Sequence, residues 1–184
     1  MLGEKVLPQL LEGLPASYTF RAWIPGCGSG EEAYTMAIVL HECVRQLANP
    51  LAFQIFATDL NATSIDYARA GRYPEGIAAD VPADLLKRHF VHEDGFYRVR
   101  SEIRERIVFA EQDVIKDPPF TKLDLLCCRN LLIYLNSELQ QRLLPIFHHA
   151  LKPGCILVLG PSETIGPHAG LFPPWTRNGR CSAD

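Results

Sequence analysis

The sequence predicts an α/β fold, in which a mostly parallel sheet has helices on both faces and carries a small antiparallel insertion. Short apolar runs alternate with longer segments whose apolar residues recur every three or four positions, which is typical of strands alternating with helices. The first apolar run, residues 22–24, leads through a glycine-rich turn into a helical pattern. This alternation favours parallel strands joined by crossover helices, and residues 72–106 interrupt it with a hairpin signal.

The N-terminal half has clear boundary signals. The pair Asn49-Pro50 stops one helical pattern, while Thr63 as an N-cap and Gly71 as a C-terminal stop bound the next. In chain order, we expect a short helix within residues 1–19, a strand at 22–24, a helix at 31–47, a strand at 53–58 and a helix at 63–70.

The C-terminal half contains the hairpin and the remaining core strands. The turn signal is Glu93-Asp94-Gly95, and Pro145 falls inside a helical pattern, where we expect a kink. We expect Lys152-Pro153-Gly154 to end that helix. In chain order, the predicted elements are a loop at 72–81, a short helix at 82–89 that begins near Asp80, hairpin strands at 89–92 and 96–100, strands at 107–110 and 123–128, a helix from 136–137 to about 151 and a strand at 155–159.

Composition narrows the class of protein. The chain has 184 residues with 47% hydrophobic and 21% charged, which suits one globular domain, and its net charge of -3 gives no electrostatic footprint for nucleic acid or an anionic membrane. No apolar run approaches the roughly 20 residues that span a bilayer, and the N-terminus is too mixed for a signal peptide. We therefore expect a cytoplasmic protein with no membrane insertion.

Cysteine and histidine patterns indicate neither a disulfide framework nor a metal site. Six cysteines occur without a C-x-x-C pair, and several lie in apolar runs, so we interpret them as reduced core residues. Six histidines include the neighbours His148 and His149, but no H-E-x-x-H motif is present.

The glycine turn after the first strand is the central candidate for ligand binding. Gly26, Gly28 and Gly30 allow a tight turn and close approach of the backbone to a ligand. A dinucleotide fingerprint needs glycine where this chain has Glu31, and a Walker loop needs a lysine that is absent. With Glu32 also acidic, a phosphate is disfavoured and a cationic nucleoside such as S-adenosylmethionine fits better.

An alternative interpretation of this turn involves no ligand. In the S-x-x-E pattern, Ser29 and Glu32 could form a capping box for the following helix. Because Glu31 is not needed for such a cap, Glu31 is the better candidate for contacting a ligand.

Polar residues follow three further strands, at the sheet edge where ligands bind parallel α/β proteins. Asp59, at the end of the second strand, could accept both hydroxyls of a ribose, and Asp113 could accept from an adenine amino group. Arg129 and Asn130 end the fourth strand. Each residue has a simpler role open to it: a helix cap for Asp59, a turn for Asp113 and a surface ion pair for Arg129.

Several segments resemble the chemotaxis receptor methyltransferase family, CheR. The resemblance covers roughly residues 20–165 and is carried by GCGSGEEAYTMAI, FATDLNATSIDYARAGRY, the hairpin ending YRVR, CCRNLLIYL and LKPGCILVLGPSE. It implies a class I methyltransferase (Rossmann-like) fold that uses S-adenosyl-L-methionine and releases S-adenosyl-L-homocysteine. The implied reaction is methyl esterification of glutamate side chains on the cytoplasmic domain of a chemoreceptor or a receptor-like protein.

The resemblance also assigns roles to individual residues. It implies receptor docking by the insertion at 72–106, with Arg98 on the receptor or substrate side, and places Tyr134 on the substrate side of the cleft. The implied cofactor contacts are Glu31, Asp59, Asp113 with Val114, and Arg129 with Asn130.

The domain organisation follows from the same resemblance. Residues 1–19 correspond to the tail of an N-terminal helical domain or linker, and residues 20–184 to the methyltransferase domain. The similarity is strongest to modules fused to methylesterase and sensor domains. The C-terminal segment lacks the apolar alternation of the family's final antiparallel strand, and Pro145 interrupts a helix that is regular in the family.

Two other functions stay open from the sequence. One is a non-catalytic module for cofactor sensing or docking. The other is an amino-group methyltransferase acting on adenine, because Asp117-Pro118-Pro119-Phe120 resembles that class's signature. The signature belongs after the fourth strand and here precedes it, so we interpret these residues as a loop connector.

Overall fold

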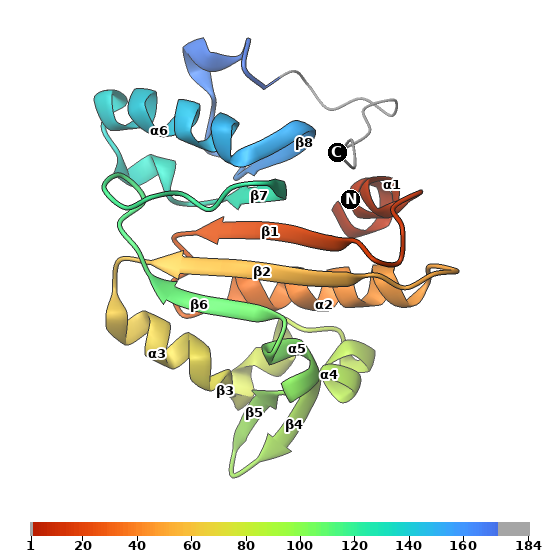
Figure 1. The fold of residues 1–184 in the computed structure, drawn as a ribbon. Coiled ribbons are helices and arrows are strands. Elements are labelled where there is room, and N and C mark those ends of the chain that lie inside the picture. The colour runs from red at the N-terminus through yellow and green to blue at the C-terminus, as the bar shows by residue number, and fades with distance from the viewer. Residues whose placement is uncertain (1, 173–184) are drawn as a thin grey trace.

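A computed structural model describes residues 2–172 and confirms the predicted α/β architecture (Figure 1). Five parallel strands form the main sheet in the order β6-β2-β1-β7-β8. Their bounds are Thr19–Pro25 for β1, Ala52–Asp59 for β2, Ile107–Glu111 for β6, Leu123–Cys128 for β7 and Leu151–Leu159 for β8. The chain reverses its direction of strand addition between β1 and β7, so a topological switch point lies at their carboxyl ends.

Helices cover both faces of this sheet, as predicted. Ile24 and Leu40 belong to a core on the α1–α2 face, whereas Trp23 and Phe147 belong to a core under α6. Neighbouring residues of β1 therefore point into opposite cores. The helices are α1 (Leu7–Leu11), α2 (Glu31–Arg45), α3 (Ala62–Ala70), α4 (Ala83–His89), α5 (Ser101–Arg104) and α6 (Ser137–Ala150), with shorter turns at Leu2–Val6, Glu75–Ala79, Leu132–Tyr134 and Gly166–His168.

A second, antiparallel sheet is formed by β3 (Arg72–Pro74), β5 (Phe96–Val99) and β4 (Phe90–Glu93), below the main sheet in Figure 1. Asp94 and Gly95 both have positive φ, of 49° and 74°, which confirms the predicted hairpin turn. The prediction of a plain loop at 72–81 was wrong, because three residues of that segment pair with β5.

Three predicted boundaries were also wrong. Asn61, not Thr63, caps α3, because its side chain accepts a hydrogen bond from the amide of Ser64 at 3.1 Å. The short helix α4 follows Pro82 rather than starting near Asp80. The strand β8 begins at Leu151, directly after α6, because an irregular register with β7 accommodates the proline on this outer strand.

The cysteines within residues 2–172 divide into two groups. Cys27, Cys43, Cys127 and Cys128 are free thiols, as expected. Cys155 is disulfide-bonded, so the expectation of reduced thiols was wrong for this residue.

Within residues 2–172, no helix combines the length and the hydropathy that crossing a membrane requires. The sequence does not predict the family's final antiparallel strand in the C-terminal segment. Most of that segment, residues 173–184, lies outside the described residues.

A buried carboxylate ties together the strands at the edge opposite the switch point. Asp124 of β7 is 1% exposed and pairs with Lys152 Nζ of β8 at 2.9 Å. It also accepts hydrogen bonds from the amide of Arg21 at 2.8 Å and from the hydroxyl of Tyr18. A buried charge is tolerated only when it is paired in this way.

Replacing this carboxylate should therefore destabilise the fold. We expect Asp124→Asn to lower the free energy of unfolding by about 3 kcal/mol, because Lys152 keeps its charge without its partner. Urea denaturation followed by circular dichroism measures this loss. The control is Asp66→Asn, which breaks a mostly exposed pair with Arg69 and should cost less than about 1 kcal/mol. Equal losses in the two variants would contradict the assignment.

Candidate cofactor site

The loop between β1 and α2 is built from glycines in the left-handed region of backbone space. Gly26, Gly28 and Gly30 have φ of 70°, 52° and 93°. A Cβ at Gly30 would lie 2.8 Å from the Cβ of Ala68 and 3.2 Å from the hydroxyl of Tyr73, so only glycine fits there. A Cβ at Gly28 would meet no described heavy atom within 4 Å, so the loop faces open space at this point.

The end of β2 holds this loop in place. The two carboxylate oxygens of Asp59 accept hydrogen bonds from the amides of Gly28, at 2.8 Å, and Asn61, at 2.9 Å. The amide of Cys27 donates to the carbonyl of Thr58 at 2.9 Å. Asp59 is therefore a loop anchor rather than a helix cap, and each of its oxygens retains capacity for a further hydrogen bond.

The two glutamates that open α2 point to different partners. The Ser29 hydroxyl donates to the Glu31 carboxylate, with 2.7 and 2.8 Å to its two oxygens. Glu32 Oε1 lies 3.2 Å from the Cys127 thiol and 3.5 Å from the Arg129 guanidinium, both at the end of β7. The capping box is not formed, because Gly30 occupies the N-cap position and Ser29 precedes it by one residue.

The loop after β7 carries Arg129 and Asn130 and is fixed by a residue whose role the sequence analysis missed. Asn130 has a φ of 58°, in the left-handed region. The Glu163 carboxylate accepts hydrogen bonds from the amides of Leu131, Leu132 and Gly160 at 2.8–2.9 Å. A carboxylate shortly after a predicted strand was the available signal for this residue.

Asp113 organises the turn after β6. Its Oδ1 accepts hydrogen bonds from the amides of Ile115 at 3.0 Å and Lys116 at 3.3 Å, and its Oδ2 pairs with Lys116 Nζ at 3.0 Å. These contacts, first that of Ile115, lower the pKa of Asp113 below its ordinary value. Val114 packs against the core under α6. The turn role is thus shown for Asp113, and its contact with adenine stays a prediction.

Hydrogen bonding joins the end of β6 to the end of β2, since the amide of Gln112 donates to the carbonyl of Asp59 at 3.0 Å. The structure therefore gathers the loop, Asp59 and the turn of Asp113 at one edge of the sheet. Through Glu32 and Arg129, the end of β7 joins the same edge. This is the convergence that the strand-end pattern predicted.

The negative charge of this edge is visible in the environment of Cys27. Burial, followed by the nearby carboxylates of Asp59, Glu31 and Glu32, raises the pKa of this thiol to about 12. The thiol is therefore protonated and is no nucleophile. Three carboxylates around an open glycine loop fit a cationic, phosphate-free nucleoside, so the residues present suit S-adenosylmethionine.

The two residues predicted for the substrate side lie elsewhere. Tyr134, in the turn Leu132–Tyr134 after β7, is 79% exposed. Arg98 is on β5 of the second sheet, where it pairs with Glu93 at 3.8 Å. Neither residue is shown in contact with the glycine loop, and both roles stay predictions.

A second residue that the sequence analysis missed links the insertion to the loop. Tyr73 of β3 is 3% exposed, and its hydroxyl donates to the carbonyl of Ser29 at 2.8 Å.

The D-P-P-F segment, residues 117–120, is a connector, as interpreted. Phe120 stacks on Phe56 at 4.3 Å, and the Asp117 carboxylate accepts a hydrogen bond from the amide of Asp113.

Fold and site together define a domain with the class I, S-adenosylmethionine-binding architecture. The chain matches the family described as "CheR methyltransferase, SAM binding domain" over residues 1–178, and it belongs to this family. S-adenosylmethionine is accordingly its cofactor.

Relatives extend beyond the region shared with this chain. A protein of Rhodobacter capsulatus named "Uncharacterized 104.1 kDa protein in hypE 3'region" is 43% identical over 164 residues, which are 89% of this chain and 17% of that protein. A "Chemotaxis protein methyltransferase" of Borreliella burgdorferi is 32% identical over 175 residues, covering 92% of this chain and 62% of that one. The chain thus spans less than two thirds of these relatives. Among solved structures, it is similar to PKMT2 from Rickettsia typhi in complex with AdoHcy, with a TM-score of 0.48 and 17% identity over 83% of this chain and 23% of that chain.

The tight packing at Gly30 leads to a prediction. We expect Gly30→Ala to lower the free energy of unfolding by about 2 kcal/mol, because the new methyl group meets Ala68 at a strained φ. Urea denaturation measures the change, and Gly76→Ala is the control because its Cβ meets nothing within 4 Å. A Gly30→Ala variant as stable as the control would show that the loop is looser than described.

Proposed function

We propose that this domain, within its full-length protein, methylates glutamate side chains on the cytoplasmic domain of a chemoreceptor or a receptor-like protein. The observation that carries the proposal is the grouping of Glu31, Glu32 and Asp59 around an open glycine loop in a CheR-family domain. The name "Chemotaxis protein methyltransferase" of relatives at 31–32% identity supports the same function.

Individual residues are assigned by their chemistry. Asp59 accepts hydrogen bonds from the ribose hydroxyls, and Glu31 pairs with the amino group of the methionine part. Asp113 and Val114 bind the adenine, and Arg129 with Asn130 closes the opposite side. The spare acceptor capacity of Asp59 and the exposure of Glu31 support these roles.

The reaction needs no general base. When bound, S-adenosylmethionine supplies a methyl group on a positively charged sulfur. The substrate carboxylate is already ionised at neutral pH, since the pKa of a glutamate is about 4.3. The site residues then act by orienting the reactants and excluding water, with Tyr134 on the substrate side. The raised pKa of Cys27 is consistent with a site that contains no protein nucleophile.

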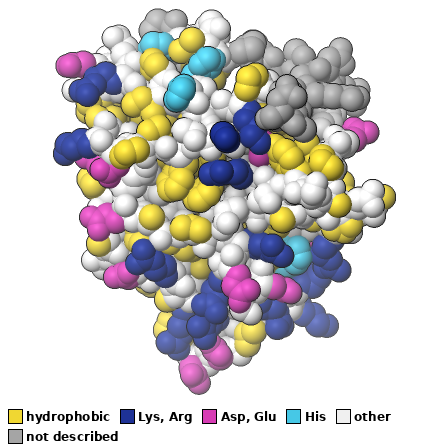
Figure 2. Space-filling view, viewed as in Figure 1, with side chains coloured by type: hydrophobic (Ala, Val, Ile, Leu, Met, Phe, Trp, Pro, Cys, Tyr) yellow, Lys and Arg dark blue, Asp and Glu magenta, His cyan; other side chains and the backbone are white. Residues whose placement is uncertain are grey.

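The insertion at 72–106 is assigned to receptor docking. Figure 2 shows Lys and Arg side chains interspersed with Asp and Glu over the lower part of the molecule, where Figure 1 places β3, β4 and β5. Arg72 and Arg98 of this sheet are exposed, and their guanidinium groups can pair with glutamates that a partner presents. A cytoplasmic location follows if that partner is the cytoplasmic part of a receptor.

We further propose that the chain is one module of a longer protein. In this view, residues 1–19 are the exit of an N-terminal helical domain, residues 20–184 are the methyltransferase domain, and methylesterase and sensor domains are attached in the same polypeptide. The 17% share of the Rhodobacter capsulatus protein supports this organisation.

Substitution of Asp59 tests the cofactor site. We expect Asp59→Asn to weaken binding of S-adenosylhomocysteine at least tenfold, about 1.4 kcal/mol, because an amide cannot accept from both ribose hydroxyls. Isothermal titration calorimetry measures the affinity, and the exposed Asp66→Asn is the matched control. Unchanged affinity in Asp59→Asn would refute the assignment.

Transfer of labelled methyl groups from S-adenosylmethionine to receptor fragments tests the activity in the full-length protein. We expect base-labile label on fragments that carry the glutamates and none on fragments with Glu→Gln changes. Cofactor binding without methyl transfer would contradict the enzymatic function and favour a non-catalytic sensor or docking module.

A further inference from the structure

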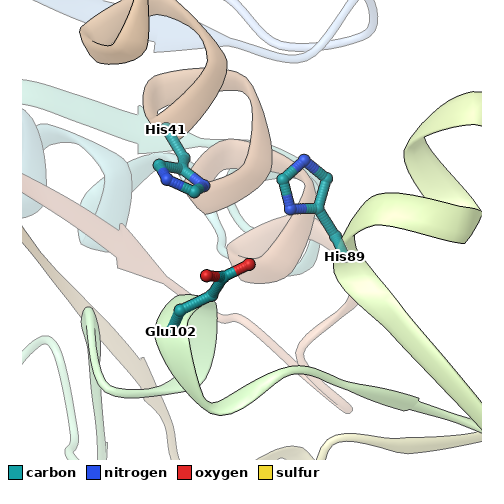
Figure 3. A group of neighbouring side chains, drawn as sticks. All are labelled: His41, His89 and Glu102. Atoms are coloured by element: carbon teal, nitrogen blue, oxygen red, sulfur yellow. The ribbon is translucent and has the colours of Figure 1, made fainter.

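A cluster of three candidate ligands lies where α2 meets the insertion, away from the glycine loop. His41 comes from α2, His89 from the end of α4 and Glu102 from α5 (Figure 3). One potential ligand atom from each residue lies within 4.8 Å of the other two. Figure 3 shows the two imidazole rings and the carboxylate pointing toward a common space.

His89 has a lone pair that the fold leaves unused. Its side chain is 1% exposed, and its Nδ1 is buried with no hydrogen-bond partner among the described residues. Its Nε2 lies 2.9 Å from Glu42 Oε1. A carboxylate can only accept, so Nε2 donates to Glu42; in the neutral form of the ring, Nδ1 is then an acceptor on the side of the cluster. A histidine that binds a metal through one ring nitrogen usually donates its other N–H to a carboxylate, which fixes the orientation of the ring.

The remaining two residues complete a ligand set. His41 is half-buried, its Nδ1 is likewise buried without a partner in the described chain, and its ring centroid lies 5.4 Å from that of His89. Burial is the main cause that lowers the pKa of His41, which favours the neutral ring. Glu102 is exposed and forms no ion pair within residues 2–172, so it contributes a negative charge and a path from solvent.

The two nearby arginines, Arg45 and Arg88, both pair with carboxylates, and Arg45 lies 3.6 Å from Glu42. The Arg88 guanidinium pairs with Glu42 and, at 2.8 Å, with Asp84. Burial raises the pKa of Glu42, but its contacts with His89 and Arg88 outweigh this effect and lower the pKa below its ordinary value. Glu42 is therefore ionised. A cation between the two histidines would thus face the Glu102 carboxylate, with Glu42 behind His89 on the far side of the ring.

We propose that His41, His89 and Glu102 bind a divalent transition-metal ion, with Zn²⁺ the best fit. Two imidazole nitrogens and one carboxylate oxygen suit Zn²⁺, whereas Mg²⁺ and Ca²⁺ prefer sets made of oxygens alone. Tetrahedral Zn²⁺ with bonds of about 2.0–2.1 Å needs ligand atoms about 3.4 Å apart. Binding would therefore require His41 and Glu102 to rotate and shorten the present separations, and neither side chain is fully buried.

Such an ion would fasten the insertion to the cofactor-binding part of the domain. The helix α2 begins at the glycine loop, and α4 and α5 flank the strands of the second sheet. One metal ion would therefore link three segments that are far apart in sequence. Because the ligands stand at positions 41, 89 and 102, no short motif could reveal them.

The test uses the 184-residue chain after removal of metal with a chelator. We expect one Zn²⁺ per chain in a competition titration against a chromophoric chelator. At a free Zn²⁺ concentration a hundredfold above Kd, the midpoint of thermal unfolding should rise by roughly 6 °C. No binding at 100-fold excess of Zn²⁺ over protein would overturn the proposal.

Variants locate the ion. His41→Gln and Glu102→Gln are used because neither side chain is fully buried, and each should weaken Zn²⁺ binding at least tenfold without lowering the thermal midpoint of the metal-free chain. The matched controls are His92→Gln and Glu105→Gln, both at exposed positions of the insertion, and both should bind as the parent does. Binding that survives His41→Gln and Glu102→Gln would overturn the proposal, as would sulfur ligands in the X-ray absorption spectrum of the Zn²⁺ complex.

Discussion

The paired hydrogen bonds from the amides of Gly28 and Asn61 to the Asp59 carboxylate are the contact on which the site depends. They join the loop after β1 to the end of β2, next to the switch point between β1 and β7. Without these hydrogen bonds, the three glycines with positive φ would be free to adopt other backbone conformations. We propose that the same carboxylate accepts from the ribose hydroxyls, so the interaction that shapes the loop also belongs to the proposed binding surface.

The insertion is coupled to this loop rather than appended to it. Tyr73 reaches from β3 to the carbonyl of Ser29, and its ring lies edge-on to Tyr34 of α2. The proposed metal ligands join α2 to the insertion a second time, near the other end of that helix. A partner bound at the second sheet would therefore be linked to the glycine loop through direct contacts, because both attachments involve α2 or the residues just before it.

Much of this arrangement could be predicted from sequence, because it depends on local signals. Apolar runs locate parallel strands, and polar residues at their ends must meet at one edge, so Asp59 and Asp113 were found by position alone. The sequence could not decide which of two neighbouring residues takes the N-cap position of a helix. Ser29 and Glu32 have the spacing of a capping box, and only the backbone shows that Gly30 takes the N-cap. Contacts between distant segments, such as those of Tyr73, Glu163 and the His41 cluster, have no local signal at all.

We propose that the carboxyl ends of β1, β2, β6 and β7 form one binding surface for S-adenosylmethionine. Amide chemical shifts recorded by NMR during titration with S-adenosylhomocysteine test it most directly. We predict that the amides of Gly28, Asp59, Val114 and Asn130 shift together with one dissociation constant, while those of β5 (Phe96–Val99) in the hairpin keep their positions in the spectrum. Shifts confined to the hairpin, or to the exposed surface around Arg69 and Glu105, would contradict the account.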